Sequence, residues 1–467
     1  MIKKLTLCFT TTILLACCQT RPKENFDILI VNATIVDVKS GEVSVGKLIG
    51  ITNDTIRMVD NMDHENKFES AIKLDAENNY VMPGLWDMHV HFRGGDTLID
   101  ENKNLLPLFL AYGVTTVRDA GGDMTTSVMG WQEQIKQRTL LGPNIYTSGP
   151  KLDGANPAWE GSLKVETVDD IKKAIDSLDL LGVDYVKMYD GSLSKEAFYG
   201  IIQEAEKRSL KTTGHMPLSA DILKAARLGL DGSEHMYYVL KSCSPVQDSL
   251  THLNIGFGMI ETILGTYDPI LARQVFLELG AQGFYVTPTN AVVKVLSDVS
   301  ERDHSKDSLL AYIGEGIIKT YQNRVEGAKK ARAQGRRNLY QDVLSLSTQY
   351  IPEMNRAGIN ILTGSDSGAF NSYCYPGESL IKELILLVES GLTPQQALKA
   401  SIINGPHFFG LDDHYGSIAA GKVADIIVLR KNPLDDIENT KTLAKLIKGG
   451  KVYDIKEIHA ILKSLNN

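Results

Sequence analysis

The stretch PGLWDMHVHFRG, residues 83–94, places two histidines one residue apart at the end of an apolar run. Side chains alternate along an extended chain, so His89 and His91 lie on the same face of a predicted strand. Two imidazoles on one face are a candidate metal site, although a polar strand end gives the same pattern. Asp87 lies on that face one step earlier and could orient a metal-binding side chain from behind. The rest of the chain has to decide between these interpretations.

Further short apolar runs follow this one, and amphipathic segments separate them. One such segment, TVDDIKKAIDSLDLLG, begins with Thr167 as a predicted N-cap. Strand and helix alternating eight times predict an α/β fold, a (β/α)8 TIM-like barrel over residues 81–410. The eight runs are YVMPGLWDMHVH (80–91), GVTTVRDAG (113–121), NIYTSGP (144–150), VDYVKMYD (183–190), KTTGHMP (211–217), DGSEHM (231–236), GFYVTPT (283–289) and INILTGSD (359–366).

The interval before the last run, residues 290–358, is long, charged and helical in pattern. It predicts either an extended helical excursion that could cover the site or one long surface helix. Outside the barrel, residues 26–80 and 411–467 alternate as strands do and are broken by Gly, Asn and Asp. Gly449-Gly450 is a predicted hairpin turn. Both ends of the chain together therefore predict one small β-sandwich domain.

The first twenty residues, MIKKLTLCFTTTILLACCQT, have two lysines, a short apolar stretch and then cysteines. This pattern predicts a signal peptide over residues 1–16 and a tether over residues 17–25, because the apolar part is too short to span a membrane. LLAC resembles the bacterial lipobox, which implies a lipid on Cys17 and a cell-envelope lipoprotein exported across the inner membrane, facing the periplasm or on the outer membrane. Secretion with ordinary cleavage is the alternative.

The composition excludes some partners. The formal net charge is −8 and the basic residues are scattered, whereas a nucleic-acid surface needs a clustered basic face. No later segment has the 18 or more apolar residues of a membrane span. The cysteines lack zinc-type spacing, so those outside the N-terminal segment are expected to be packing residues. A homo-oligomer is possible.

Polar residues stand near the ends of several predicted strands. Besides the two histidines of the first run, they are Lys187, His215, His235 and Asp366. The C-terminal mouth of a barrel is where its chemistry lies, so these side chains should converge there. Each has an ordinary explanation by itself, such as a turn residue or a solvated strand tip. Six together at one end predict a metal site.

The motifs PGLWDMHVH, GVTTVRDAGG, VDYVKMY, GHMP, SEHM, LTGSDSG and GSIAAGKVADIIVL together resemble the amidohydrolase superfamily, in its imidazolonepropionase-like and metal-dependent prolidase-like branch. The resemblance extends from about residue 26 to 455. It implies that His89 and His91 hold the more buried metal ion beside Asp366. It further implies a second ion on His215 and His235. The resemblance places Lys187 between the two ions as a carbamate formed with carbon dioxide.

What this resemblance implies is hydrolysis of a C–N bond in a small amide, cyclic amide or dipeptide. Two divalent ions, with zinc favoured and iron, manganese or nickel open, would hold a bridging hydroxide. Asp366 would then act as base and afterwards as acid. Arg118, Tyr189, Tyr237 and Tyr238 follow barrel strands and could contact a substrate carboxylate or ring; an ion pair for the arginine and packing for the tyrosines are the alternatives.

Other functions remain open at this point. A deaminase on the same barrel generally uses one metal ion and does not need Lys187, so that lysine argues against it. A lactonase would use the same barrel. A non-catalytic envelope binding protein on this scaffold is a further alternative, but such a protein is expected to have lost metal ligands, and this chain retains the whole set.

Overall fold

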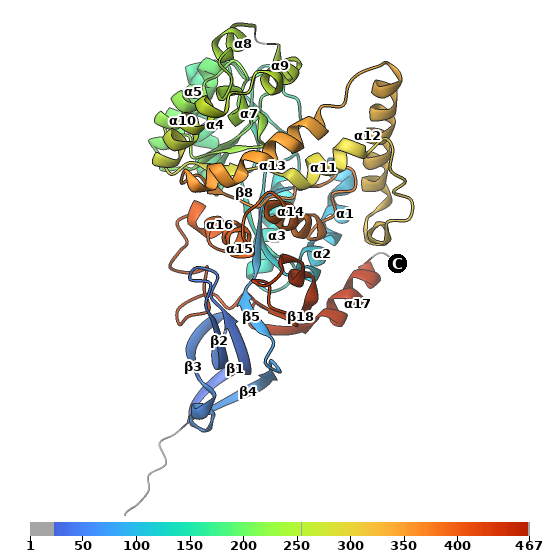
Figure 1. Ribbon diagram of the computed structural model, residues 1–467. Coiled ribbons are helices and arrows are strands. Elements are labelled where there is room, and N and C mark those ends of the chain that lie inside the picture. Colours follow the sequence, from blue (N-terminus) through green and yellow to red (C-terminus); the bar gives the residue numbers. More distant parts are fainter. Residues whose placement is uncertain (1–22, 254, 466–467) are drawn as a thin grey trace, which may run out of the picture.

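The computed structural model describes residues 23–253 and 255–465 (Figure 1). The predicted signal peptide, Cys17 and most of the predicted tether lie outside these residues. Within the described part of the chain, no helix is both long and apolar enough to cross a bilayer. Cys243 and Cys374 are buried free thiols, as expected for packing residues.

Strands from both ends of the chain form one mixed sheet at the lower end of the molecule in Figure 1. Hydrogen bonds join eight strands in this single sheet, where the sequence predicted two packed sheets. The reason is that β1 pairs with β2 at one edge and with both β4 and β5 at the other. The strands are β1 (Glu24–Val36), β2 (Val43–Thr52), β3 (Thr55–Asn61), β4 (Phe68–Asp75), β5 (Tyr80–Pro83), β17 (Ile426–Leu429), β18 (Leu443–Lys448) and β19 (Lys451–Asp454).

The predicted turn between β18 and β19 is confirmed. Gly449 and Gly450 have φ angles of 57° and 74°, which glycine adopts without strain. After β19 the chain forms the helix α17 (Ile455–Leu465), which packs against α2. The last part of segment 411–467 is therefore helical, although its pattern was interpreted as strands.

Each of the eight predicted apolar runs contains a strand. They form three parallel segments, β16-β6-β7-β8, β10-β9-β11-β12 and β13-β14-β15. Single backbone hydrogen bonds run between segments: Asp184 N to Thr147 O at 2.9 Å, Asp231 N to Thr212 O at 3.2 Å, and Met88 N to Thr363 O at 2.8 Å. The strands are β6 (Leu85–His91), β7 (Val114–Asp119), β8 (Asn144–Thr147), β9 (Leu152–Asp153), β10 (Leu163–Lys164), β11 (Val186–Met188), β12 (Thr212–Gly214), β13 (Gly232–Glu234), β14 (Tyr285–Thr287), β15 (Asn360–Ile361) and β16 (Ser367–Gly368).

Helices follow the parallel strands, and the main hydrophobic core lies between the two. Thr167 caps α4 as predicted, in a reciprocal capping box with Asp170. The helices around the parallel strands are α1 (Ile99–Asn104), α2 (Leu106–Ala111), α3 (Thr125–Lys136), α4 (Val168–Leu181), α5 (Lys195–Glu206), α6 (Ile222–Arg227), α7 (Tyr237–Ser242), α8 (Gln247–Leu253), α9 (Ile260–Gly265), α10 (Pro269–Ala281), α14 (Glu378–Glu389), α15 (Pro394–Ile402) and α16 (Asn404–Phe408). Short 3-10 helices are η1 (Met62–Lys67), η2 (Asp96–Leu98), η3 (Gly256–Met259) and η5 (Ile437–Thr442).

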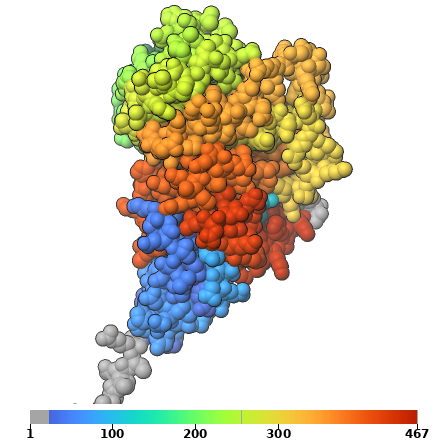
Figure 2. Space-filling model, in the orientation of Figure 1, coloured from blue at the N-terminus to red at the C-terminus, as the bar shows by residue number. Residues whose placement is uncertain are grey.

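The interval 290–358 is a helical excursion and not one long helix. It contains α11 (Asn290–Asp298), the short 3-10 helix η4 (Ser308–Tyr312), α12 (Glu315–Ala333) and α13 (Tyr340–Arg356). α12 stands out from the rest of the molecule at the right of Figures 1 and 2. Glu101 of α1 fastens its first turn by accepting hydrogen bonds from the backbone N–H groups of Gly316 and Ile317. The alternative of a single surface helix is wrong.

Candidate metal centre

The six residues predicted to gather at the strand ends lie close together. His89 and His91 belong to the end of β6, and Lys187 belongs to β11. The other three lie directly beside short strands: His215 follows β12, His235 follows β13 and Asp366 precedes β16. The parallel strands therefore bring side chains nearly 280 residues apart in sequence (89 to 366) into one site.

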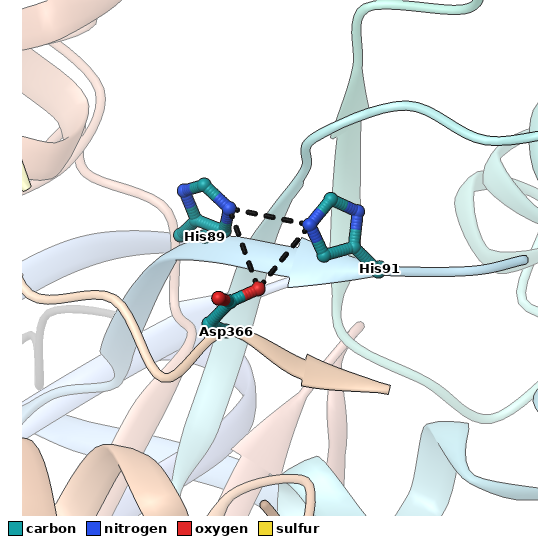
Figure 3. A group of neighbouring side chains, drawn as sticks. All are labelled: His89, His91 and Asp366. Carbon is teal, nitrogen blue, oxygen red and sulfur yellow. Dashed lines mark hydrogen bonds and ion pairs between the residues drawn. The ribbon is translucent and has the colours of Figure 1, made fainter. Parts of the chain in front are cut away.

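The first group consists of His89, His91 and Asp366, which point toward one another in Figure 3. The Nε2 atoms of the two histidines are 3.3 Å apart. Asp366 Oδ1 lies 3.5 Å from Nε2 of His89 and 3.2 Å from Nε2 of His91. Two imidazole nitrogens and one carboxylate oxygen that converge in this way are a ligand set that suits a zinc-class ion.

The second group is the pair His215 and His235, whose Nε2 atoms are 3.0 Å apart. The ring centroids of His89 and His235 are 5.2 Å apart, so the two groups adjoin. Burial lowers the pKa of all four histidines below the ordinary value. Neutral imidazoles are the form that binds metal ions.

Each histidine is held by its other ring nitrogen. His89 Nδ1 bonds Glu234 Oε2 at 2.5 Å and His91 Nδ1 bonds the Gly121 carbonyl at 3.3 Å. In the second group, His215 Nδ1 bonds Asp190 at 3.0 Å and His235 Nδ1 bonds the Thr289 hydroxyl at 2.6 Å. A partner on Nδ1 leaves Nε2 of the same ring available as a ligand. All four Nε2 atoms are thus directed inward.

Lys187 is buried in surroundings that suit the predicted carbamate. Its side chain is fully buried, and among the described residues its Nζ has no hydrogen-bond partner. A buried ammonium without a partner is costly, and burial lowers the pKa of Lys187 to about 8. A neutral amine is the form that reacts with carbon dioxide, so the residue present suits a carbamate. Lys151 is also buried without a partner, so the position of Lys187 within β11 is what distinguishes it.

Asp87 supports the turn that carries Asp366. Its carboxylate accepts hydrogen bonds from the backbone N–H and the hydroxyl of Ser365, at 2.9 and 2.5 Å. It also accepts a longer one, 3.3 Å, from the backbone of His89. As the sequence predicted, Asp87 lies behind the site. It does not hold an imidazole ring; it holds Ser365, and so fixes the turn that carries Asp366. No imidazole of the centre is its partner in the described structure.

Arg118 lies beneath the site and not in the substrate cavity. Its side chain is 1% exposed and its Nη2 donates to Glu234 Oε1 at 2.6 Å. The predicted contact with substrate is therefore wrong, and the ion-pair alternative is what the structure has. Sequence reasoning missed Glu234, although the residue stands directly before His235 in the run DGSEHM. It also missed Asp190 and Thr289, each of which stands two residues after the end of a strand, β11 and β14 respectively.

The three candidate tyrosines surround the second histidine pair. Tyr189 stacks on His215 with ring centroids 4.2 Å apart, and Tyr237 stacks on His235 at 5.6 Å. Both line the cavity. Tyr238 instead donates its hydroxyl to Asp190 at 2.7 Å and so supports the partner of His215. Two of the tyrosines are therefore positioned to meet a ligand, and one supports the centre.

The centre opens into a cavity of about 930 Å³. His91, His215, His235 and Asp366 line its inner end, and side chains from α11, α12 and α13 line its outer part. The excursion therefore covers the site, as one of the two interpretations of the sequence expected. A cavity of this volume is at the upper end of the range for small-molecule sites.

Comparison with known proteins agrees with this geometry. The chain matches the model of the Amidohydrolase family over residues 80–453. It belongs to the amidohydrolase family, in which a TIM-barrel-like fold carries an additional domain, and it is a hydrolase that acts on carbon–nitrogen bonds.

The individual relatives include a prolidase-like structure, as the predicted branch of the family implies, and also deaminases. Ochratoxinase of Aspergillus niger is 24% identical over 432 residues, which cover 80% of this chain and 75% of the relative. Adenine deaminase of Bacillus velezensis is 27% identical over 221 residues, 46% of this chain and 36% of that protein. A solved Xaa-Pro dipeptidase with methionine in its active site has a TM-score of 0.66 at 19% identity and covers 91% of this chain and 99% of that one. The last similarity is one of fold.

Proposed function

We propose that this protein is a binuclear metal-dependent hydrolase that cleaves the C–N bond of a small amide, cyclic amide or dipeptide. The observation that carries the proposal is that the four histidines are arranged alike. In each ring, Nδ1 has a hydrogen-bond partner behind the site, and Nε2 is directed inward. His89, His91 and Asp366 would hold one divalent ion, and His215 and His235 the other. Lys187, as a carbamate, would contribute to both. Zinc suits these ligands best.

Two such ions, when bound, supply Lewis acidity that polarises the amide carbonyl and makes water a stronger nucleophile. The chain itself supplies the proton transfer. Asp366 Oδ1 lies at the inner end of the cavity, where it can take a proton from the attacking water and deliver it to the leaving nitrogen. Asn371 holds that carboxylate in place by donating to Oδ1 at 2.6 Å.

The proposal includes a closed barrel. We propose that the three parallel segments are parts of one eight-stranded ring made of β6, β7, β8, β11, β12, β13, β14 and β15. The three hydrogen bonds between segments support it, because they run between the neighbours that a closed ring requires. Closure matters for function because it directs the ends of all eight strands toward one mouth.

The relatives support an amide or peptide as the substrate. Ochratoxinase and the Xaa-Pro dipeptidase structure both carry names of the hydrolase class, and the latter contains a free amino acid. The dipeptidase among these neighbours favours an amide with an amino-acid leaving group.

Metal content and amine release test the proposal together. Purified protein should contain about two divalent ions per chain, and metal-loaded protein should release amine from at least one member of a screen of dipeptides, N-acyl amino acids, hydantoins and lactones. Lys187→Ala should lose metal, with partial rescue by short carboxylic acids; Lys330→Met, an exposed lysine on α12, is the control. Protein that binds no metal under careful handling would favour a non-catalytic binding protein.

Deamination is the second candidate, because adenine deaminases match part of the chain. It differs in its product: a deaminase releases ammonia from an aminated ring, whereas the proposed hydrolase releases an amine from an amide. Lys187 in its partnerless, buried position favours the hydrolase. Ammonia release from adenine by metal-loaded protein, without hydrolysis of any amide, would reverse the choice. Lactone hydrolysis alone would indicate a lactonase.

The cellular location is likewise a proposal. The first twenty residues suggest export, lipidation at Cys17 and attachment to an envelope membrane through that lipid. The substrate would then be a small molecule met outside the cytoplasm, and a homo-oligomer is possible. Incorporation of labelled fatty acid at Cys17 tests the anchor.

A further inference from the structure

The loop that begins at Asp366, residues 366–375, has an unusual backbone. Asp366, Phe370 and Tyr373 have φ angles of 55°, 69° and 60°. This is the left-handed region, which a residue with a side chain adopts only at a cost in energy. Such conformations persist where surrounding contacts hold them. The contacts around this Asp366 loop therefore show what fixes it in place.

One support comes from α12, the helix that stands out at the right of Figure 1. Thr320 accepts a hydrogen bond from the Phe370 N–H at 2.9 Å, and the Tyr321 carbonyl accepts one from the Ser372 hydroxyl at 2.9 Å. Arg324, one turn further along the helix, donates to the Phe370 carbonyl at 3.1 Å. Three contacts from one side of α12 thus hold the middle of the Asp366 loop.

The segment before α12 holds the end of the same loop. The ring of Tyr373 stacks on His304 with centroids 3.7 Å apart and an interplanar angle of 6°. The hydroxyl of Tyr375 donates to Asp307 at 3.0 Å, and His304 bonds the same carboxylate through Nδ1 at 2.9 Å. These contacts and those of α12 all belong to the helical excursion of residues 290–358.

Asn371 connects the clamped loop to the Asp366 carboxylate. Its Nδ2 donates to the Asp366 carbonyl at 2.5 Å and to Asp366 Oδ1 at 2.6 Å. Its Oδ1 lies 3.4 Å from Arg324 Nη1, which is a donor. Two acceptors at one end of the amide and a donor at the other fix its orientation. A single residue therefore lies between α12 and the carboxylate.

The barrel, by contrast, holds the backbone of Asp366 and the start of the loop. The Asp366 N–H donates to the His89 carbonyl at 2.7 Å, and Arg93 donates to the Ala369 carbonyl at 2.8 Å. None of the six candidate metal ligands lies within the excursion. Loosening the excursion should therefore leave these ligands on their strands, while the Asp366 carboxylate becomes free to turn.

We infer that Asn371 is a positioning residue for the Asp366 carboxylate. Its own place is set by α12, through Thr320 and Arg324. The excursion then serves turnover as well as covering the cavity, because it fixes the group that moves the proton. This inference rests on the proposed role of Asp366 in proton transfer and adds the residues that orient it.

Replacements on both sides of the contact test the clamp. Thr320→Val removes the acceptor of the Phe370 N–H, keeps the side-chain shape and lies outside the cavity lining. Loss of one net hydrogen bond corresponds to roughly a fivefold fall in kcat, with KM unchanged. Asn371→Ala should lower kcat by roughly 10- to 100-fold. Both variants should keep the zinc content of the wild type. The substrate is the amide found by the amine-release screen.

A matched control and a double variant show whether the effect passes through Asn371. Thr348→Val is the control, because Thr348 lies on α13 of the same excursion and its hydroxyl bonds carbonyls of its own helix. It should leave kcat unchanged. Thr320→Val combined with Asn371→Ala should be no slower than Asn371→Ala alone, since both act on one carboxylate. Effects that multiply would overturn the path from α12 through Asn371.

The outcomes separate this inference from the proposed function. Wild-type kcat in Asn371→Ala overturns the inference, and so does a loss of zinc in proportion to turnover, which would show a structural role. If the wild type hydrolyses no amide, the proposed catalysis fails and the visible spectrum of cobalt-loaded protein decides the positioning. A spectrum changed by Asn371→Ala and Thr320→Val but not by Thr348→Val supports it, whereas an unchanged spectrum overturns it.

Discussion

Glu234 connects the surrounding strands to His89 of the candidate metal centre, and Glu234→Gln tests whether it orients that ring. Its two oxygens serve different partners. Oε2 accepts from His89 Nδ1 at 2.5 Å, and Oε1 accepts from Arg118 at 2.6 Å and from the Thr213 hydroxyl at 2.7 Å. A glutamine has one oxygen and one NH₂ group in these positions. One of the donors, His89 or Arg118, must therefore face another donor.

The expected magnitude has two parts. Loss of a partner behind a metal-binding histidine typically costs 10- to 100-fold in metal affinity, about 1.4–2.7 kcal/mol. Removing the negative charge also leaves Arg118 without a counter-ion in a fully buried position. Breaking a buried ion pair from one side costs about 3–5 kcal/mol of folding free energy. Metal affinity and the stability of the metal-free protein should both fall.

The assay is competition for zinc with a chelator of known affinity, together with urea denaturation of metal-free protein. Glu383→Gln is the matched control, because Glu383 is also fully buried but bonds the backbone of Ala291 and no histidine. It should bind zinc as the wild type does. Folded Glu234→Gln protein with wild-type zinc affinity would refute the view that Glu234 orients His89.

Three further predictions concern other parts of the chain. Asp366→Asn should lower turnover by about 10²–10⁴-fold, with a smaller change in metal content; near-normal turnover would remove Asp366 from proton transfer. Burial raises the pKa of Glu383 from an ordinary 4.5 to about 8, so between these values the unfolded carboxyl is ionised while the folded one stays protonated. The free energy of unfolding should therefore fall as pH rises through this window, and Glu383→Gln should flatten the slope in urea denaturation at pH 5.5 and 8; parallel slopes would contradict it. Cys17→Ser should abolish incorporation of labelled fatty acid, and continued labelling would exclude the lipobox.

The convergence of the candidate metal ligands could be predicted because it depends on a simple rule. Parallel strands that alternate with helices end at one edge, so polar residues at strand ends converge whatever their separation in sequence. To apply this rule, it is enough to know where the strands end, and the pairing of neighbouring strands need not be known. The rule therefore placed His89, Lys187 and Asp366 together without knowledge of the pairing between β6, β11 and β16.

The residues that support the ligands could not be predicted in the same way. His89 is held by a residue 145 positions away, and His235 by one 54 positions away. Which of several polar residues near a strand end reaches a given ring depends on the angle of that side chain, which the strand pattern does not contain. Arg118 illustrates this, since its place at the end of β7 was right but its guanidinium turns inward to Glu234.

The backbone at the centre gives a physical reason for this limit. His235, Thr289 and Asp366 have φ angles of 62°, 52° and 55°, in the left-handed region that costs a residue with a side chain roughly 1–3 kcal/mol. Such conformations persist when surrounding bonds hold them. The backbone N–H of His235 donates to the Thr287 carbonyl at 2.9 Å, and that of Asp366 donates to the His89 carbonyl at 2.7 Å. Neighbouring strands therefore impose a turn that local sequence would not choose, and this turn brings the ligand side chains back over the strand ends.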